Sequence, residues 1–149
     1  MTSRDDSSLR RFVEAQEDHG TYAKALAELK QGRKRGHWIW YVLPQLRGLG
    51  RSWTADHYGI AGRAEARAYA DDPVLGPRLV ECVAAILEHR GTPARDILGG
   101  LDAMKFRSCL TLFSVAAPEV PVFAEALDVF FDGEPDPLTL DLLRERGEV

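Results

Sequence analysis

The chain has 149 residues, of which 45% are hydrophobic and 28% are charged, and its formal net charge is −4 at pH 7. This length is typical of one domain with one sizeable core. No apolar run approaches the ~20 residues of a membrane helix, which excludes a membrane span, and the polar, acidic start is unlike a secretory signal. We therefore expect a single cytoplasmic domain over residues 1–149, with frayed ends at 1–7 and 145–149.

Charge and spacing disfavour several kinds of partner. A general nucleic-acid binder spreads basic residues over a whole face, and a net charge of −4 argues against that. Cys82 and Cys109 lie in helical patterns rather than in a disulfide or metal spacing, so we expect both to be reduced core residues. The four histidines show no metal-ligand spacing either, and we predict no metal and no cofactor.

Two predicted helices lead into the middle of the chain. Ser7 or Ser8 can cap the first, and Thr21 can cap a second that ends at Gly32. Each has one face at the spacing of an amphipathic helix: Leu9, Phe12, Val13 and Gln16 in the first, and Tyr22, Ala25, Leu26 and Leu29 in the second.

The second half of the chain also has helical patterns. Ser52 is a candidate cap for a short helix, and a longer helix should run from Leu101 to about Ala116. Three further helix starts are marked by a proline after a capping residue, in Asp72-Pro73, Thr92-Pro93 and Asp136-Pro137. We predict an all-α protein, a single-domain multihelical bundle of about seven to nine helices.

The central segment, residues 33–51, is where we expect the functional surface, because it is rich in basic and aromatic residues and contains no acid. Residues 37–43 suit either a strand or a short buried helix ended by Pro44. We choose the helix, because a single strand would have no sheet to join. Such a helix places Trp38 and Trp40 roughly 200° apart, so at least one of them should line a cleft.

The basic residues of the central segment fit an anion-binding site. Arg33, Lys34 and Arg47 carry the side chains that bind phosphate or carboxylate groups. The alternative for the basic run that begins at Arg33 is a solvated turn after a helix, which is what most short charge runs are.

The aromatic and polar residues beside them extend this hypothesis. Trp38 or Trp40 would stack on a ring of the ligand, and His37 is the candidate catalytic acid or base. Gln45 could contact the ligand or satisfy backbone groups. The alternatives are a core histidine and core tryptophans.

We predict a second wall of the site on the helix from Leu101. Lys105, Ser108 and Thr111 follow one side of it and would supply a lysine and two hydroxyl donors. The alternative is an exposed face whose hydroxyls bond back to helix carbonyls. Asp102 is expected to be the N-cap of this helix.

The chain is similar to a known family through motifs that include segments Gly32-Arg33-Lys34-Arg35-x-His37-Trp38-x-Trp40, Pro44-Gln45-Leu46-Arg47-Gly48-Leu49-Gly50-x-Ser52, Tyr58-Gly59-Ile60 and Asp102-x-x-Lys105. These motifs resemble those of the bacterial domain-of-unknown-function 1810 family, over nearly the whole chain. The resemblance implies a mainly α-helical single domain and supplies no function. Cys109 stands where this family typically has a second serine, which removes one hydroxyl from the predicted wall.

The sequence thus favours a protein that binds an anionic, phosphorylated or nucleotide-like small molecule in a cleft lined by the central segment. If it is an enzyme, we expect hydrolysis or transfer at a phosphate or glycosidic bond. The alternative is a protein-interaction module whose patch receives an acidic partner segment without catalysis. A deep pocket with His37 inside would favour the small molecule, and a shallow exposed aromatic patch would favour the partner.

Overall fold

The computed structural model describes residues 4–149, with side chains from Leu9 onward. Its helices of nine residues or more are α1 (Arg4–Glu17), α2 (Thr21–Gln31), α5 (Arg63–Asp71), α6 (Leu75–Leu87), α8 (Gly100–Ala116), α9 (Pro121–Phe131) and α10 (Pro137–Glu145). Between them lie the short helices α3 (Ile39–Val42), α4 (Trp53–His57) and α7 (Ala94–Leu98) and the 3-10 turn η1 (Asp18–Gly20). This part of the chain has no strand beyond one isolated bridge, so the all-α prediction is confirmed. None of its helices is both long and apolar enough to cross a membrane.

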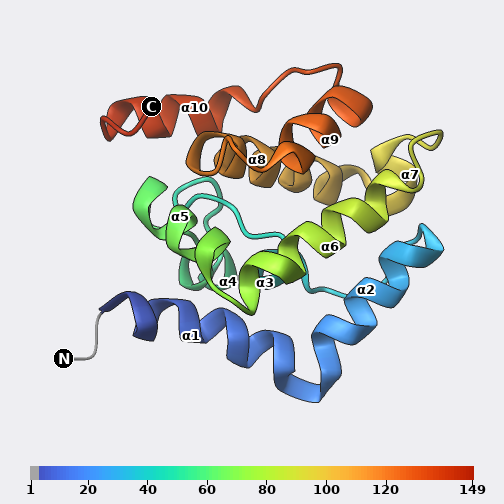
Figure 1. Ribbon diagram of the computed structural model, residues 1–149, viewed down its shortest axis with the longest axis horizontal. Coiled ribbons are helices and arrows are strands. Elements are labelled where there is room, and N and C mark those ends of the chain that lie inside the picture. Colours follow the sequence, from blue (N-terminus) through green and yellow to red (C-terminus); the bar gives the residue numbers. More distant parts are fainter. Residues whose placement is uncertain (1–3) are drawn as a thin grey trace.

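The helices α6 and α8 form the middle of the bundle. α8 contacts α5, α7, α9 and α10, and α6 contacts α2, α3, α5 and α9. Figure 1 shows α1 and α2 along one side of this pair and α9 and α10 along the other. The short helix α3 contacts both α1 and α6, so this part of the central segment lies inside the bundle.

Two of the predicted helix caps are confirmed. The Ser52 hydroxyl accepts a hydrogen bond from the Ala55 N–H at 3.0 Å, and the Asp136 carboxylate accepts one from the Thr139 N–H at 2.9 Å. Asp72 also accepts a hydrogen bond from the Leu75 N–H. However, α6 begins only at Leu75, so Asp72 lies three residues before the helix and Val74 has the cap position.

Other predicted caps are wrong, and one of them is Thr21, because α2 begins at Thr21 itself and Gly20 has the cap position. The residue before α7 is Pro93, and no side chain caps this helix, so Thr92 does not have the expected role. α1 begins at Arg4, which places Ser7 and Ser8 inside it rather than at its cap. No proline or glycine interrupts residues 4–8, so the helix extends upstream of the predicted start. The fraying expected at residues 1–7 falls partly on 1–3, which lie outside the described residues.

The helical prediction for residues 37–43 is confirmed, but the helix is a single turn, Ile39–Val42, followed by the buried Pro44. Trp38 precedes it and is buried, whereas Trp40 is half-buried and faces a cleft. The two tryptophans thus separate as their spacing predicts. The chain that follows is held by the backbone of Ile60, whose N–H donates to the Gln45 carbonyl and whose carbonyl accepts from the Arg47 N–H, both at 2.8 Å.

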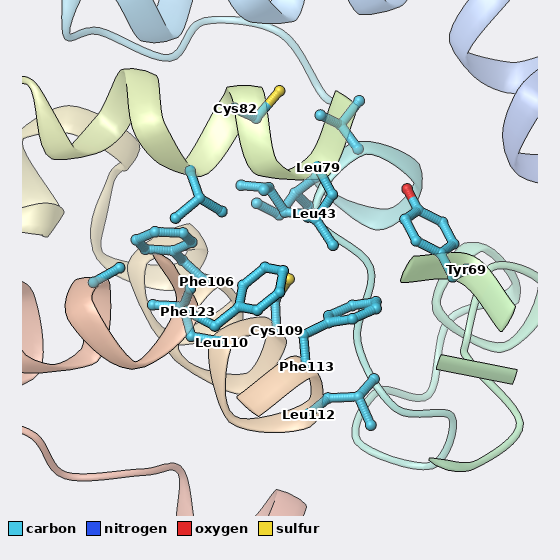
Figure 2. Packing of buried hydrophobic residues seen from close by; sticks show 14 of the residues in the cluster. Leu43, Tyr69, Leu79, Cys82, Phe106, Cys109, Leu110, Leu112, Phe113 and Phe123 are labelled. Carbon is cyan, nitrogen blue, oxygen red and sulfur yellow. The ribbon is translucent and has the colours of Figure 1, made fainter. Parts of the chain in front are cut away.

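Buried side chains of α5, α6, α8 and α9 meet in one cluster, which Figure 2 shows. The Phe113 ring centroid lies 5.5 Å from those of both Tyr69 and Phe123. Cys82 and Cys109 are free and buried in this cluster, as expected. Burial raises the pKa of the Cys82 thiol to about 12, so it is protonated and unreactive at neutral pH.

Candidate functional site

A cavity of about 220 Å³ lies between the central segment and the exposed side of α8; we name it the Gln45 cavity. The residues that line it come from the central segment, α4, α8 and the start of α10: Trp40, Gln45, Leu46, Leu49, Gly50, Ala55, Tyr58, Gly59, Leu101, Met104, Lys105, Ser108, Asp136 and Leu138. The predicted site and its predicted second wall therefore meet here.

A second cavity, of about 420 Å³, adjoins the first; we name it the Lys34 cavity. Its lining residues are Lys34, His37, Trp40, Leu98, Gly99, Gly100, Leu101, Asp102 and Lys105. Trp40, Leu101 and Lys105 belong to both linings, so the two cavities are the ends of one cleft divided by these side chains.

Trp40 and Lys105 form the divide between the cavities. The Lys105 ammonium lies 4.5 Å from the centroid of the Trp40 ring, which is a cation–π distance. The two residues come from elements 65 positions apart in the sequence. An aromatic ring and a cation that touch in the wall of a cleft can together contact a ligand that has a ring and a negative charge.

The charge of the Lys34 cavity is set by two lysines and one acid. Lys34 Nζ lies 2.6 Å from Asp102 Oδ2, and Lys105 Nζ lies 3.4 Å from Asp102 Oδ1. Lys34 also donates to the Gly36 carbonyl and lies 4.8 Å from the Trp38 ring centroid. One positive charge of this trio is therefore not neutralised within it. The expectation that Asp102 is the N-cap of α8 is wrong, because Gly99 has that position and Asp102 lies in the first turn.

His37 is exposed at the edge of the Lys34 cavity. It is the one imidazole among the residues that line the cleft. Its carbonyl accepts a hydrogen bond from the Tyr41 hydroxyl, which fixes the backbone at this point. The side chain thus faces solvent beside the cleft rather than lying at the base of a deep pocket.

Gln45, from the central segment, and Ser108, from α8, both line the Gln45 cavity. The Ser108 hydroxyl donates to the Met104 carbonyl at 3.2 Å, one turn earlier, and leaves its lone pairs available. The Gln45 amide nitrogen is shielded from solvent and has no hydrogen-bond partner. Of the polar residues predicted for the site, Gln45, Lys105 and Ser108 come together in this cavity.

Thr111 does not contribute to the cleft, contrary to the predicted wall. Its side chain is buried, its hydroxyl donates to the Arg107 carbonyl at 2.8 Å, and the same oxygen accepts from the Asp136 N–H at 2.8 Å. Three residues further along α8 than Ser108, it has turned into the core and holds the start of α10. Its role is structural.

Arg33, Arg47 and Trp38 also lie outside the two linings. Arg33 is exposed, and the Arg47 guanidinium donates to the Asp56 carbonyl at 3.0 Å. Trp38 is buried, and its indole N–H donates to Glu28 at 2.9 Å. The predicted convergence of basic residues is therefore reduced to Lys34 and Lys105.

Glu28 occupies backbone N–H groups of the loop at residues 33–36, which we name the basic loop, and these groups could otherwise bind an anion. Its Oε1 accepts hydrogen bonds from the backbone N–H groups of Arg35 and Gly36, at 2.7 and 3.0 Å, as well as from Trp38. Burial alone would raise the pKa of this carboxyl, but these three bonds and the nearby Lys34 hold the pKa below its ordinary value. Glu28, 8 positions before Gly36, thus takes the N–H groups that the basic loop would otherwise offer to an anion from solution.

Sequence reasoning missed the apolar part of the cleft. Leu101 and Met104 lie on the same side of α8 as Lys105 and Ser108, at the i, i+3, i+4, i+7 spacing of one helix face. Two large apolar residues on the exposed face of an otherwise core-forming helix are the signal that could have found them. Asp136, expected only as a cap, is the other polar residue that was missed.

Comparison with known proteins assigns the chain to a family. The model of a protein family described as "Protein of unknown function (DUF1810)" matches residues 6–143. The chain belongs to the DUF1810 family. The resemblance seen in the sequence motifs is therefore confirmed, and with it the expected mainly α-helical fold.

A solved structure is similar to this DUF1810 protein over most of its length. It is the crystal structure of the conserved hypothetical protein Rv1873 from Mycobacterium tuberculosis, which is 43% identical, with a TM-score of 0.88 and coverage of 91% of this chain and 96% of the other. A search of curated proteins gives no match. In the described part of this chain, no three His, Cys, Asp or Glu side chains form a group that could hold a metal ion.

Proposed function

We propose that this DUF1810 protein binds a small anionic molecule, phosphorylated or nucleotide-like, in the cleft between the central segment and α8. The observation that carries the proposal is the contact of Trp40 with Lys105 in the wall shared by the two cavities. Ligand sites are typically concave and apolar, with a few convergent polar groups, and this cleft has that composition.

The anionic group belongs at the Lys34 cavity. Lys34, Lys105 and Asp102 together carry one positive charge, which suits one carboxylate or one phosphate. The 17-residue helix α8 begins in this cavity without a side-chain cap, so its free N–H groups and dipole also favour negative charge there. Arg33 and Arg35 are exposed nearby in sequence and would attract an anion from solution rather than hold it.

If the protein is an enzyme, His37 is the residue that we propose to be catalytic. As the imidazole beside the Lys34 cavity, it is the candidate acid or base for hydrolysis or transfer at the bound group. The proposal also includes a cytoplasmic location, because the free thiols of Cys82 and Cys109 suit a reducing compartment.

The test is a thermal-shift and calorimetric screen of inorganic phosphate, sugar phosphates and nucleoside monophosphates. A ligand that binds the folded state raises the Tm in proportion to the logarithm of its concentration. We expect Lys105→Met to weaken binding about tenfold or more, by analogy with the loss of a charge-assisted contact. Lys30→Met, which removes an exposed lysine outside the cleft, is the matched control and should bind like the wild type. If no anion raises the Tm, or if Lys105→Met binds as well as Lys30→Met, the proposal is wrong.

The second candidate is a protein-interaction module that receives an acidic partner segment. It is favoured by His37, which is exposed at the edge of the cleft and not inside a deep pocket. It is also favoured by the exposed apolar side chains at the mouth of the Gln45 cavity, where Leu101, Met104 and Leu138 are 76%, 67% and 64% exposed. The two candidates respond differently to Met104→Ser. This change should abolish the binding of a partner segment laid across the mouth, and should leave the binding of inorganic phosphate in the Lys34 cavity, whose lining does not include Met104, within about twofold of wild type.

A further inference from the structure

We propose that the ligand of this cleft consists of an uncharged, planar heterocycle with adjacent hydrogen-bond donor and acceptor atoms, joined to the single anionic group. The ring enters the Gln45 cavity while the anion stays in the Lys34 cavity. This inference rests on the proposed function and defines the ligand class and its orientation.

Gln45 supplies the first reason. Its amide nitrogen is covered from solvent and unpartnered, although buried polar groups are nearly always hydrogen-bonded. Among the described residues the other such atom is the Ser114 hydroxyl oxygen, which does not line either cavity. Gln45 lines the cavity and its amide nitrogen is covered behind that surface, so a turn of this side chain would present the amide to an acceptor atom on a bound ring.

Asp136 supplies the second reason and fixes the orientation. Asp136 lines the Gln45 cavity, and the two hydrogen bonds that its carboxylate accepts, from the Thr139 N–H and hydroxyl, both go to Oδ2. The negative charge repels an anion from this cavity, while Oδ1 can accept a hydrogen bond from an amino or ring N–H group. The uncharged end of the ligand therefore faces Asp136, and the anionic end faces Lys105.

The shape and surface of the cavity supply the third reason. A volume of 220 Å³ corresponds to roughly seven water molecules of liquid, which is room for one ring or a fused pair of rings. Leu46, Leu49 and Tyr58 provide apolar walls. A flat ring can contact these apolar walls, Gln45 and Asp136 together, whereas a sugar phosphate can offer hydroxyl groups to Gln45 but has no flat apolar face for the walls.

The experiment compares AMP, CMP and UMP with ribose 5-phosphate, which has the same anion and sugar but no ring base, by calorimetry. We expect at least one of the three nucleotides to bind about tenfold more tightly than ribose 5-phosphate. Gln45→Leu should remove this advantage and leave the affinity for ribose 5-phosphate unchanged. Gln31→Leu, at an exposed glutamine outside the cleft, is the matched control.

The Tm of Gln45→Leu is a second readout, because a structural role of Gln45 predicts a lower Tm and a ligand-binding role does not. Because Gln45→Leu removes an unpaired buried amide, we expect its Tm to equal or exceed that of the wild type. If Gln45→Leu does not fold, or if its Tm falls, Gln45 is a structural residue and the inference is overturned. Gln45→Met, with a side chain of similar length, should show the same selective loss of nucleotide affinity.

The possible failures are distinguishable. If ribose 5-phosphate binds through Lys105 but the nucleotides bind no more tightly, or if Gln45→Leu weakens all of them alike, this inference is overturned and the proposed function stands. If neither ribose 5-phosphate nor any nucleotide binds, the proposed function is overturned with it.

Discussion

Lys34 Nζ and Asp102 Oδ2 lie 2.6 Å apart and join the central segment to the first turn of α8. The side chains are 5% and 18% exposed, so the pair is shielded from water. The Lys34 N–H also donates to the Ile97 carbonyl at 2.8 Å, which attaches the same residue to α7. This one residue therefore fixes the position of the basic loop relative to the helix that forms the other wall of the cleft.

Lys34→Met should lower the free energy of unfolding by about 3 kcal/mol or more, because it leaves the Asp102 carboxylate shielded from water without its closest partner. The measurement is urea denaturation at neutral pH. Replacing both residues, as Lys34→Met with Asp102→Leu, should restore much of the loss, since no unpaired charge then remains. Lys105→Met removes the longer and more exposed contact to Asp102 and should cost at most about 1 kcal/mol. Equal losses of stability for Lys34→Met and Lys105→Met would show that the buried Lys34–Asp102 contact contributes no more than the exposed one.

Glu28 should make stability depend on pH in the acid range. Its folded-state pKa is held below the ordinary value of 4.5, so the carboxylate contributes stability that is fully present above about pH 4.5. This contribution is lost as the pH falls through the lower, folded-state pKa. We expect Glu28→Gln to unfold about 1–2 kcal/mol more easily than wild type at pH 7. The two free energies of unfolding should converge as the pH falls below the folded-state pKa of Glu28.

The control for this experiment is Glu88→Gln, at an exposed position. Its free energy of unfolding should follow that of the wild type at every pH. A difference between wild type and Glu28→Gln that stays constant from pH 7 to pH 3 would show that the loop does not depend on the charge.

The helices could be predicted from the sequence because their signals are local. The spacing of Leu9, Phe12 and Gln16 indicates which face of α1 is buried, and Asp136-Pro137 marks the start of α10 correctly. The different burial of Trp38 and Trp40 agrees with their spacing, although Trp38 lies just before the helical turn. Each of these features depends on residues within two turns of one another.

The site could be predicted only in part, because its ionic contacts join distant elements. Nothing near Lys34 in the sequence indicates that Asp102 neutralises it, and nothing near Arg47 indicates that its guanidinium turns to a carbonyl of α4. Charge counting along the sequence therefore overstated the positive charge of the cleft. Lys105 and Ser108 were found because one helix face carries both, whereas Thr111 is far enough around α8 to be buried.

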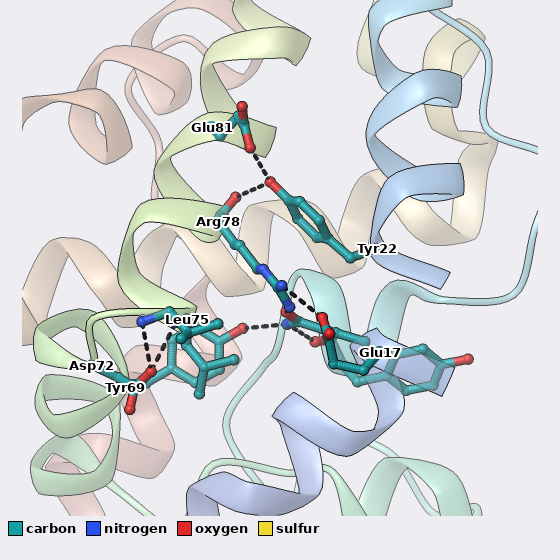
Figure 3. A network of polar contacts seen from close by, with 10 residues as sticks. Glu17, Tyr22, Tyr69, Asp72, Leu75, Arg78 and Glu81 are labelled. Atoms are coloured by element: carbon teal, nitrogen blue, oxygen red, sulfur yellow. Dashed lines mark hydrogen bonds and ion pairs between the residues drawn. The ribbon is translucent and has the colours of Figure 1, made fainter. Parts of the chain in front are cut away.

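Gln16 should be the most sensitive polar residue outside the cleft. It is 1% exposed, and its amide donates to the Tyr41 carbonyl at 2.7 Å and to the Tyr69 hydroxyl at 3.2 Å while accepting from Arg78. Figure 3 shows Arg78 reaching from α6 toward Glu17 on α1 in the same network. Gln16→Leu leaves the partly buried Tyr41 carbonyl and the buried Tyr69 hydroxyl without these hydrogen bonds, and we expect a loss of about 3 kcal/mol in the free energy of unfolding.

Two variants calibrate the Gln16 measurement. Tyr69→Phe removes only the hydroxyl that receives one of the bonds and should cost about 1 kcal/mol. Gln31→Leu, at an exposed glutamine, should change the free energy of unfolding by no more than about 0.5 kcal/mol. If Gln16→Leu and Gln31→Leu unfold at the same urea concentration, the network does not stabilise the contact of α1 with α6.

Gly76 should not tolerate a side chain, because α6 begins against the end of α5. A Cβ added there would lie 2.2 Å from the carbonyl oxygen of Ala70 and 3.0 Å from its carbonyl carbon, and both are backbone atoms that cannot turn aside. Gly76→Ala gains up to about 1 kcal/mol in helix propensity, yet the clash should dominate and lower the free energy of unfolding by about 2–3 kcal/mol net. Gly91→Ala is the matched control, since a Cβ at Gly91 meets no atom within 4 Å. The urea midpoint of Gly91→Ala should stay at the wild-type value. If Gly76→Ala has the same midpoint as Gly91→Ala, α5 and α6 can separate without loss of stability, and the prediction is wrong.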